Sequence, residues 1–199
     1  METTEPAETV FAAFLAAPAW YRALVWGMLA CGGLTFGVLH AGGITAAYGR
    51  YSRPGFGPLL EPRLAWCAQE LPALLVPLFV WVRARGASAW SPPLPLALLM
   101  VHYAHRALVY PFRIRGGKPT PLVVCALAFL FCCWNGVVQG VWWARLAPAT
   151  CCGPAVALPG AALWALGVWM FRAGWVLDAL QATPRPEPDE RSKADGDWR

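Results

Sequence analysis

Long apolar stretches separated by short polar segments dominate the chain. The runs Ala23–Gly49, Pro119–Ala144 and Leu146–Phe171 contain 27, 26 and 26 residues without Asp, Glu, Lys or Arg. Each run exceeds the roughly 20 residues that an α-helix needs to cross the hydrocarbon core of a bilayer. The pattern therefore predicts an all-α fold, a polytopic transmembrane helical bundle, with spans near 23–47, 64–82, 91–112, 120–144 and 155–177.

The polar segments define the connections and the ends of this bundle. Residues 48–63 form a loop rich in Pro, Gly and Arg, and residues 83–93 form a short connection on the other side. We expect residues 1–22 to form a luminal segment and 23–177 the transmembrane domain. The polar, Pro-containing composition of 178–199 predicts a disordered cytosolic tail. The chain starts with an acidic stretch, unlike a signal peptide, so the first span is expected to be an uncleaved anchor.

The charge distribution predicts the orientation of the spans. The net charge of +5 alone would suit a nucleic-acid partner. With the N-terminus in the lumen, however, only four basic residues face outward, and the positive-inside rule favours that arrangement. We therefore expect a bilayer environment and no nucleic-acid partner. Twelve of the 16 Lys and Arg residues then face the cytosol: Arg50, Arg53, Arg63, Arg106, Arg113, Arg115, Lys118, Arg172, Arg185, Arg191, Lys193 and Arg199.

The cysteines and histidines do not form a recognisable metal site. The seven cysteines include no CxxC pair and lie mostly within apolar runs, and the chain has three histidines without an HExxH motif. We expect the cysteines to be small packing residues and predict no metal.

Polar residues enter the predicted spans at three places. Glu70 follows Gln69 and precedes Pro72 inside an apolar run. A carboxylate at membrane depth costs several kcal/mol unless it is paired, hydrated or protonated, which favours a functional role. The alternative is an interfacial Glu whose side chain reaches outward to water.

The other two insertions lie on the next predicted spans. Tyr103 and Arg106 occupy one helix face near the cytosolic interface, where an interfacial tyrosine is the alternative. Asn135 and Gln139 stand at i, i+4 in the middle of a span. They would contact a ligand or form hydrogen bonds between helices, and the sequence leaves both open.

These insertions, in this order, resemble the steroid 5α-reductases (3-oxo-5α-steroid 4-dehydrogenases), most closely the type 1 form. The matching stretches span roughly residues 45–145, and the QELP and HYxHR motifs together make the resemblance specific. The stretches are YGR (48–50), RLAWCAQELPAL (63–74), VHYAHRALVYPF (101–112), RGGKPTPL (115–122) and NGVVQG (135–140).

The resemblance implies a multi-pass enzyme of the endoplasmic reticulum membrane, built in the family from seven helices around a lipophilic pocket. It implies NADPH-dependent reduction of the C4–C5 double bond of a 3-oxo-Δ4 steroid, such as testosterone or progesterone. Glu70 and Tyr103 match the pair that binds the 3-keto oxygen, where reduction places negative charge and donors are needed. The cofactor side is implied to include Arg106, Arg115, Lys118 and Asn135.

The sequence departs from the family pattern after residues 163–170. The family continues there with an LRKPG stretch, a YKIP-type segment and helices that hold NADPH, whereas Asp178 and its neighbours match none of these. We therefore expect this chain to bind NADPH poorly and to lack measurable reductase activity unless the family's C-terminal half is added. The alternative function is a non-catalytic membrane protein that binds steroid or associates with full-length reductase. A third hypothesis is that the protein reduces enoyl thioesters or polyprenals.

The predicted orientation can be tested by cysteine labelling in a variant of the chain without its own cysteines. Gly117→Cys should react with a membrane-impermeant thiol reagent only from the cytosolic side, because it lies in the basic loop after the third span. Ala87→Cys, in the connection on the other side, is the control and should react only from the lumen. Labelling of Gly117→Cys from the lumen alone would reject the orientation.

Overall fold

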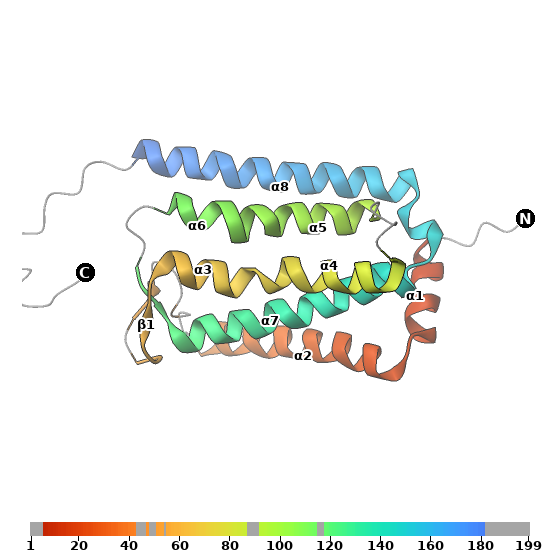
Figure 1. Cartoon of the computed structure of the whole chain (residues 1–199), viewed down its shortest axis with the longest axis horizontal. Helices are drawn as coiled ribbons and strands as arrows, with labels where there is room; N and C mark the ends of the chain where they lie inside the picture. The colour runs from red at the N-terminus through yellow and green to blue at the C-terminus, as the bar shows by residue number, and fades with distance from the viewer. Residues whose placement is uncertain are drawn as a thin grey trace, which may run out of the picture. The chain divides into compact units, whose positions relative to one another are not determined.

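The structure is a computed structural model that describes residues 6–42, 47, 51–53, 55–86, 92–114 and 118–181. The chain divides into two compact units, Met1–Leu158 and Pro159–Arg199. Helices make up nearly all of the described secondary structure, so the all-α prediction is confirmed (Figure 1). The helices of the first unit are α1 (Pro6–Ala16), α2 (Ala19–Ala41), α3 (Pro62–Glu70), α4 (Pro72–Arg85), α5 (Leu94–Ala104), α6 (Tyr110–Arg113) and α7 (Leu122–Val141).

The helix α8 (Pro154–Gln181) begins in the first unit and continues through the described part of the second. It runs past residue 177, where the last predicted span ended. Residues 182–199, in the predicted tail, lie outside the described residues.

Three of the described helical stretches are long and apolar enough to cross a membrane. They are Ala19–Ala41, Pro62–Arg85 and Leu122–Leu146, and they correspond to the first, second and fourth predicted spans. The predicted third span forms the shorter helices α5 and α6, and Ala157–Met170 of α8 is also a shorter apolar stretch. Five spans therefore remain a prediction.

The exposed surface of these helices is largely apolar. Leu34, Leu127 and Phe79 are 70%, 62% and 65% exposed, whereas Gln69 and Glu70 are 1% and 5% exposed. In a water-soluble domain the large apolar side chains are mostly buried and the carboxylates are mostly exposed. The opposite distribution here suits a protein surrounded by lipid.

The helices α4 and α7 pack with almost no space between their backbones. A Cβ atom added at Gly136 would lie 2.9 Å from the Cβ of Val76 and 3.1 Å from the carbonyl oxygen of Pro72. One at Gly140 would lie 2.9 Å from the Cα of Pro77. Small residues permit this approach, which is a common way for membrane helices to gain packing contacts.

Two side-chain hydrogen bonds join α2 to α7. The indole nitrogen of Trp134 donates a hydrogen bond to the carbonyl oxygen of Leu24 at 3.1 Å. The hydroxyl of Tyr21, buried at 2% exposure, donates to the carbonyl oxygen of Val138 at 3.2 Å. The ring of Tyr21 also stacks near Trp142, with centroids 6.4 Å apart.

Two π-helical turns, η2 (His105–Val109) and η3 (Trp142–Leu146), interrupt the helices shortly before prolines. In η2 the backbone N–H of Tyr110 bonds the carbonyl oxygen of His105, five residues back. Pro111 cannot donate to the carbonyl of Ala107, and its ring crowds that oxygen. A widened turn relieves this conflict, and such turns are frequent at functional sites.

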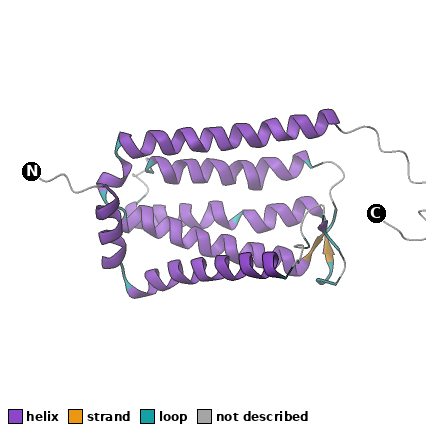
Figure 2. Cartoon of the chain, turned by 180° about the vertical axis from the view of Figure 1, so that it is seen from behind, coloured by secondary structure: helices purple, strands orange, loops and turns teal. Residues whose placement is uncertain are grey.

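A short β-pair joins two loops at one end of the helices (Figure 2). The strands β1 (Leu59–Leu60) and β2 (Thr120–Pro121) are antiparallel, with Leu60 opposite Thr120. A guanidinium nitrogen of Arg63 also donates to the carbonyl oxygen of Ile114 at 3.3 Å. The pair thus fixes the start of α3 beside the start of α7.

Gly136→Ala should destabilise the fold, because the new methyl group would press on backbone and proline atoms of α4. Overpacking of this kind costs about 1–3 kcal/mol, or about 2–4 °C in Tm for each kcal/mol in a chain of this size. Thermal unfolding in detergent measures the loss. Gly32→Ala on α2 is the matched control, because nothing lies within 4 Å of its added Cβ. Equal Tm values for the two variants would contradict the tight α4–α7 contact.

Candidate functional site

Glu70 ends α3 at a break between two helices. Glu61 caps α3 by accepting a hydrogen bond from the backbone N–H of Leu64 at 2.8 Å. Leu71 then bonds back to Cys67, and Pro72 starts α4 without a backbone N–H. Glu70 lies beside this junction, 5% exposed, and one of its oxygens is 3.4 Å from the side-chain nitrogen of Gln69.

The carboxylate of Glu70 forms an ion pair with Arg106. The Nε atom of Arg106 lies 2.9 Å from Oε2 of Glu70, and the Glu70 side chain is 7% exposed against 32% for Arg106. The guanidinium carbon of Arg106 also lies 4.9 Å from the ring centroid of Trp66. A pair of opposite charges satisfies the carboxylate inside an apolar bundle, which is the compensation such a group requires.

Tyr103 lies in the same cluster, on the turn before Arg106. Its hydroxyl is hydrogen-bonded to the side chain of Asn135 on α7, and Glu70, Arg106 and Cys132 are close enough to act on it electrostatically. The ring is half-buried, and His102 packs edge-on against it at 5.3 Å. Three separate segments, α3, α5 with η2, and α7, therefore contribute polar groups to one place.

The two predicted polar residues of α7 have different partners. Asn135 bonds Tyr103 of α5, so it joins the cluster. Gln139 accepts a hydrogen bond from the indole nitrogen of Trp143 at 3.3 Å, within its own helical stretch. The i, i+4 spacing that suggested a common role therefore does not give them a common contact.

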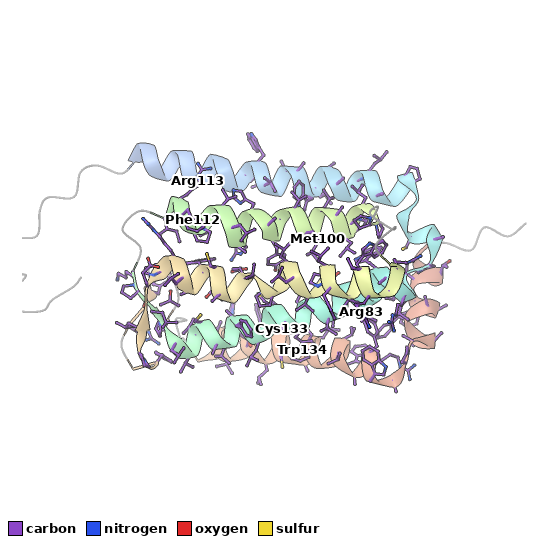
Figure 3. The ribbon with its side chains drawn as sticks, viewed as in Figure 1. Arg83, Met100, Phe112, Arg113, Cys133 and Trp134 are labelled. Carbon is purple, nitrogen blue, oxygen red and sulfur yellow. The ribbon has the colours of Figure 1, made fainter. Side chains whose placement is uncertain are left out.

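The other predicted cofactor residues lie toward the loops. Lys118 is exposed just before β2, and Arg115 lies outside the described residues. Arg113 lies at the end of α6, near the end of the molecule where α3 begins, while Arg83 lies toward the other end (Figure 3). Four described basic residues belong to the segments at the end where α3 begins, namely the loop before β1, the start of α3, the end of α6 and the approach to β2: Arg53, Arg63, Arg113 and Lys118.

Three neighbours of the cluster were not among the predicted site residues: Trp66, Tyr110 and Cys132. The rings of Trp66 and Tyr110 meet edge to face, with centroids 5.0 Å apart, and Cys132 is 5% exposed. Helical spacing carried a usable signal for the two aromatic residues. Trp66 is i−4 from Glu70, and Tyr110 is i+4 from Arg106, so each shares a helix face with a charged partner.

This arrangement offers donors and an acceptor inside apolar walls. The Tyr103 hydroxyl can donate to one ligand oxygen, the Glu70 carboxylate accepts, and the guanidinium adds positive charge. Hydrogen bonds are stronger where water is excluded, so the cluster is suited to hold the polar end of an apolar molecule.

Comparison with curated proteins relates the chain to enzymes of steroid metabolism. It is 41% identical over 127 residues to 3-oxo-5-alpha-steroid 4-dehydrogenase 1 of Macaca fascicularis, which covers 61% of this chain and 48% of the macaque protein. The Bos taurus protein of the same name is 43% identical over 133 residues, or 63% of this chain and 51% of its own length. Steroid 5-alpha-reductase DET2 of Arabidopsis thaliana is 33% identical over 105 residues, covering 50% and 40%.

The similarity is thus higher to the type 1 proteins than to DET2, in agreement with the resemblance in the motifs. The chain spans about half the length of the type 1 relatives from macaque and cattle. No protein-family model matches the chain.

Proposed function

Since the matched part of the chain is related to the steroid 5α-reductases, with type 1 proteins at higher identity, we propose that it forms the steroid-binding part of a membrane reductase. The reaction is NADPH-dependent reduction of the C4–C5 double bond of a 3-oxo-Δ4 steroid. The enzyme resides in the endoplasmic reticulum membrane with its N-terminus in the lumen. The apolar helices and the charge asymmetry of the loops support this location.

The observation that supports the proposal most is the cluster of Glu70, Tyr103 and Asn135 from three helical segments. A steroid has an apolar ring system and a single oxygen at its C3 end. An apolar bundle with one small polar cluster provides matching chemistry, because burial binds the rings and hydrogen bonds orient the oxygen. Tyr103 is the residue we assign as the donor to that oxygen, and Glu70, paired with Arg106, is the residue we assign beside it at the polar end of the site.

Tyr103 is the donor in this mechanism. Reduction of the conjugated double bond moves negative charge onto the 3-oxo oxygen, and a hydroxyl already aimed at that oxygen stabilises it. The Asn135 side chain fixes the orientation of the Tyr103 hydroxyl through their hydrogen bond. Glu70 lies beside Tyr103 with its charge balanced by Arg106, and the apolar surroundings exclude water from the reacting carbon.

The basic residues at the end of the molecule where α3 begins fit a phosphorylated nicotinamide cofactor. Guanidinium and ammonium groups bind phosphate oxygens well, and Lys118 and the arginines near it provide both. We assign phosphate groups to Lys118 and, from the sequence motif alone, to Arg115. NADPH supplies a hydride when it is bound.

The function is tested in membranes that contain this chain and, in parallel, the chain extended with the C-terminal half of the Macaca fascicularis relative. The extended chain should reduce testosterone with NADPH, and the 199-residue chain should bind tritiated testosterone saturably. Reduction of an enoyl thioester in place of testosterone would identify a different reductase. Testosterone binding without reduction by the extended chain would favour a non-catalytic steroid-binding protein.

Tyr103→Phe removes the donor and keeps the ring, so the fold should survive. In the extended chain kcat/KM for testosterone should fall by about 10²–10³, the usual loss for one donor at a developing oxyanion. Tyr51→Phe, an exposed tyrosine of the loop before α3, is the control and should match the unaltered chain. A loss for Tyr103→Phe below about threefold, less than 1 kcal/mol, would remove Tyr103 from the mechanism.

Glu70→Gln keeps a hydrogen-bonding group and removes the charge. A loss of kcat/KM smaller than that of Tyr103→Phe is expected, because the Gln amide still forms hydrogen bonds with its neighbours and Tyr103 remains the donor to the ligand oxygen. Steady-state kinetics of both variants in the extended chain make the comparison. A loss for Glu70→Gln that exceeds the Tyr103→Phe loss would assign the proton or charge of Glu70 the larger role.

A further inference from the structure

Two charged and two aromatic side chains interlock where α3 meets η2 and α6. Trp66 and Glu70 stand one turn apart on α3, and Arg106 and Tyr110 stand one turn apart on the facing segment. The ion pair is 2.9 Å, the guanidinium lies 4.9 Å from the Trp66 ring, and the two aromatic rings meet at 5.0 Å. Each residue of one segment thus contacts the other segment.

This geometry constrains the carboxylate of Glu70. Arg106 holds Oε2, and the side-chain nitrogen of Gln69 approaches Oε1, so both oxygens face donors. Trp66 in turn keeps the planar guanidinium in one orientation, which an ammonium group would not reproduce. The carboxylate is therefore held in one orientation, close to Tyr103.

We propose that Arg106 is a positioning residue that acts on the ligand through Glu70. It holds the Glu70 carboxylate in place beside Tyr103, and Trp66 holds Arg106. This inference rests on the proposed function, since Glu70 and Tyr103 are assigned there to the polar end of the steroid site. It gives Arg106 a role at the steroid end, in contrast to the cofactor side that the sequence motif implied.

A residue that acts through another loses its effect when the other is changed. Arg106→Met leaves a buried carboxylate without its cation and free to turn, so testosterone binding should weaken about tenfold, the equivalent of 1.4 kcal/mol. With Gln at position 70 there is no charge to hold. Arg106→Met added to Glu70→Gln should then weaken binding less than about twofold, since coupled neighbours are not additive.

The experiment measures the dissociation constant of tritiated testosterone in membranes with the 199-residue chain. The four forms are the unaltered chain, Glu70→Gln, Arg106→Met and the double variant. Arg145→Met, an exposed arginine of η3, controls for the loss of one basic residue and should leave the dissociation constant unchanged. Monodisperse elution in detergent checks folding, and Arg106→Lys replaces Arg106→Met in the cycle if that variant aggregates.

The outcomes separate this inference from the proposed function. Coupled losses support the positioning role of Arg106. Losses that multiply, with Arg106→Met costing tenfold on either background, overturn it and leave the proposed function intact. An absence of saturable testosterone binding in the unaltered chain overturns the proposed function and this inference with it.

Discussion

A charged carboxylate inside an apolar helical bundle requires a partner, and the arrangement of α3, η2 and α6 follows from that requirement. Glu70 is 5% exposed and lies 2.9 Å from Arg106. Without the guanidinium, the burial of Glu70 would be strongly unfavourable, because unpaired charge is the most expensive group to remove from water. The pair therefore ties the end of α3 to the segment that also contains Tyr103. Packing supports the same contact, since Trp66 covers the guanidinium and Tyr110 covers Trp66.

Helix packing elsewhere keeps this cluster aligned with α7. The close α4–α7 contact at Gly136 lies one residue from Asn135, the hydrogen-bond partner of Tyr103. A shift of α7 along α4 would move Asn135 away from Tyr103, and the crowded glycine contact resists such a shift. The polar cluster and the apolar interface are thus parts of one arrangement.

Much of the fold could be predicted from the sequence, because long uncharged apolar runs are a strong signal for membrane helices. The all-α class, spans near 23–47, 64–82 and 120–144 that overlap the observed apolar helices at 19–41, 62–85 and 122–146, and the unusual position of Glu70 were visible there. Contacts between helices were not visible. The pairing of Arg106 with Glu70 depends on which faces meet, and the π turn at η2 alters the face that an ideal helix would present. Likewise, spacing alone could not separate Asn135, which contacts Tyr103, from Gln139, which contacts Trp143.

The small β-pair sets an order for assembly during synthesis. Its strands, β1 at Leu59–Leu60 and β2 at Thr120–Pro121, enclose α3 to α6 in sequence. The pair cannot form until residue 121 has left the ribosome, and by then the whole of α3 to α6 has already emerged. The segment from α3 to α6 is therefore closed into a loop only when β2 pairs with β1, and α7 follows directly after β2. The last helix to meet the Glu70 cluster is thus the one that brings Asn135, so the cluster becomes complete only when α7 docks.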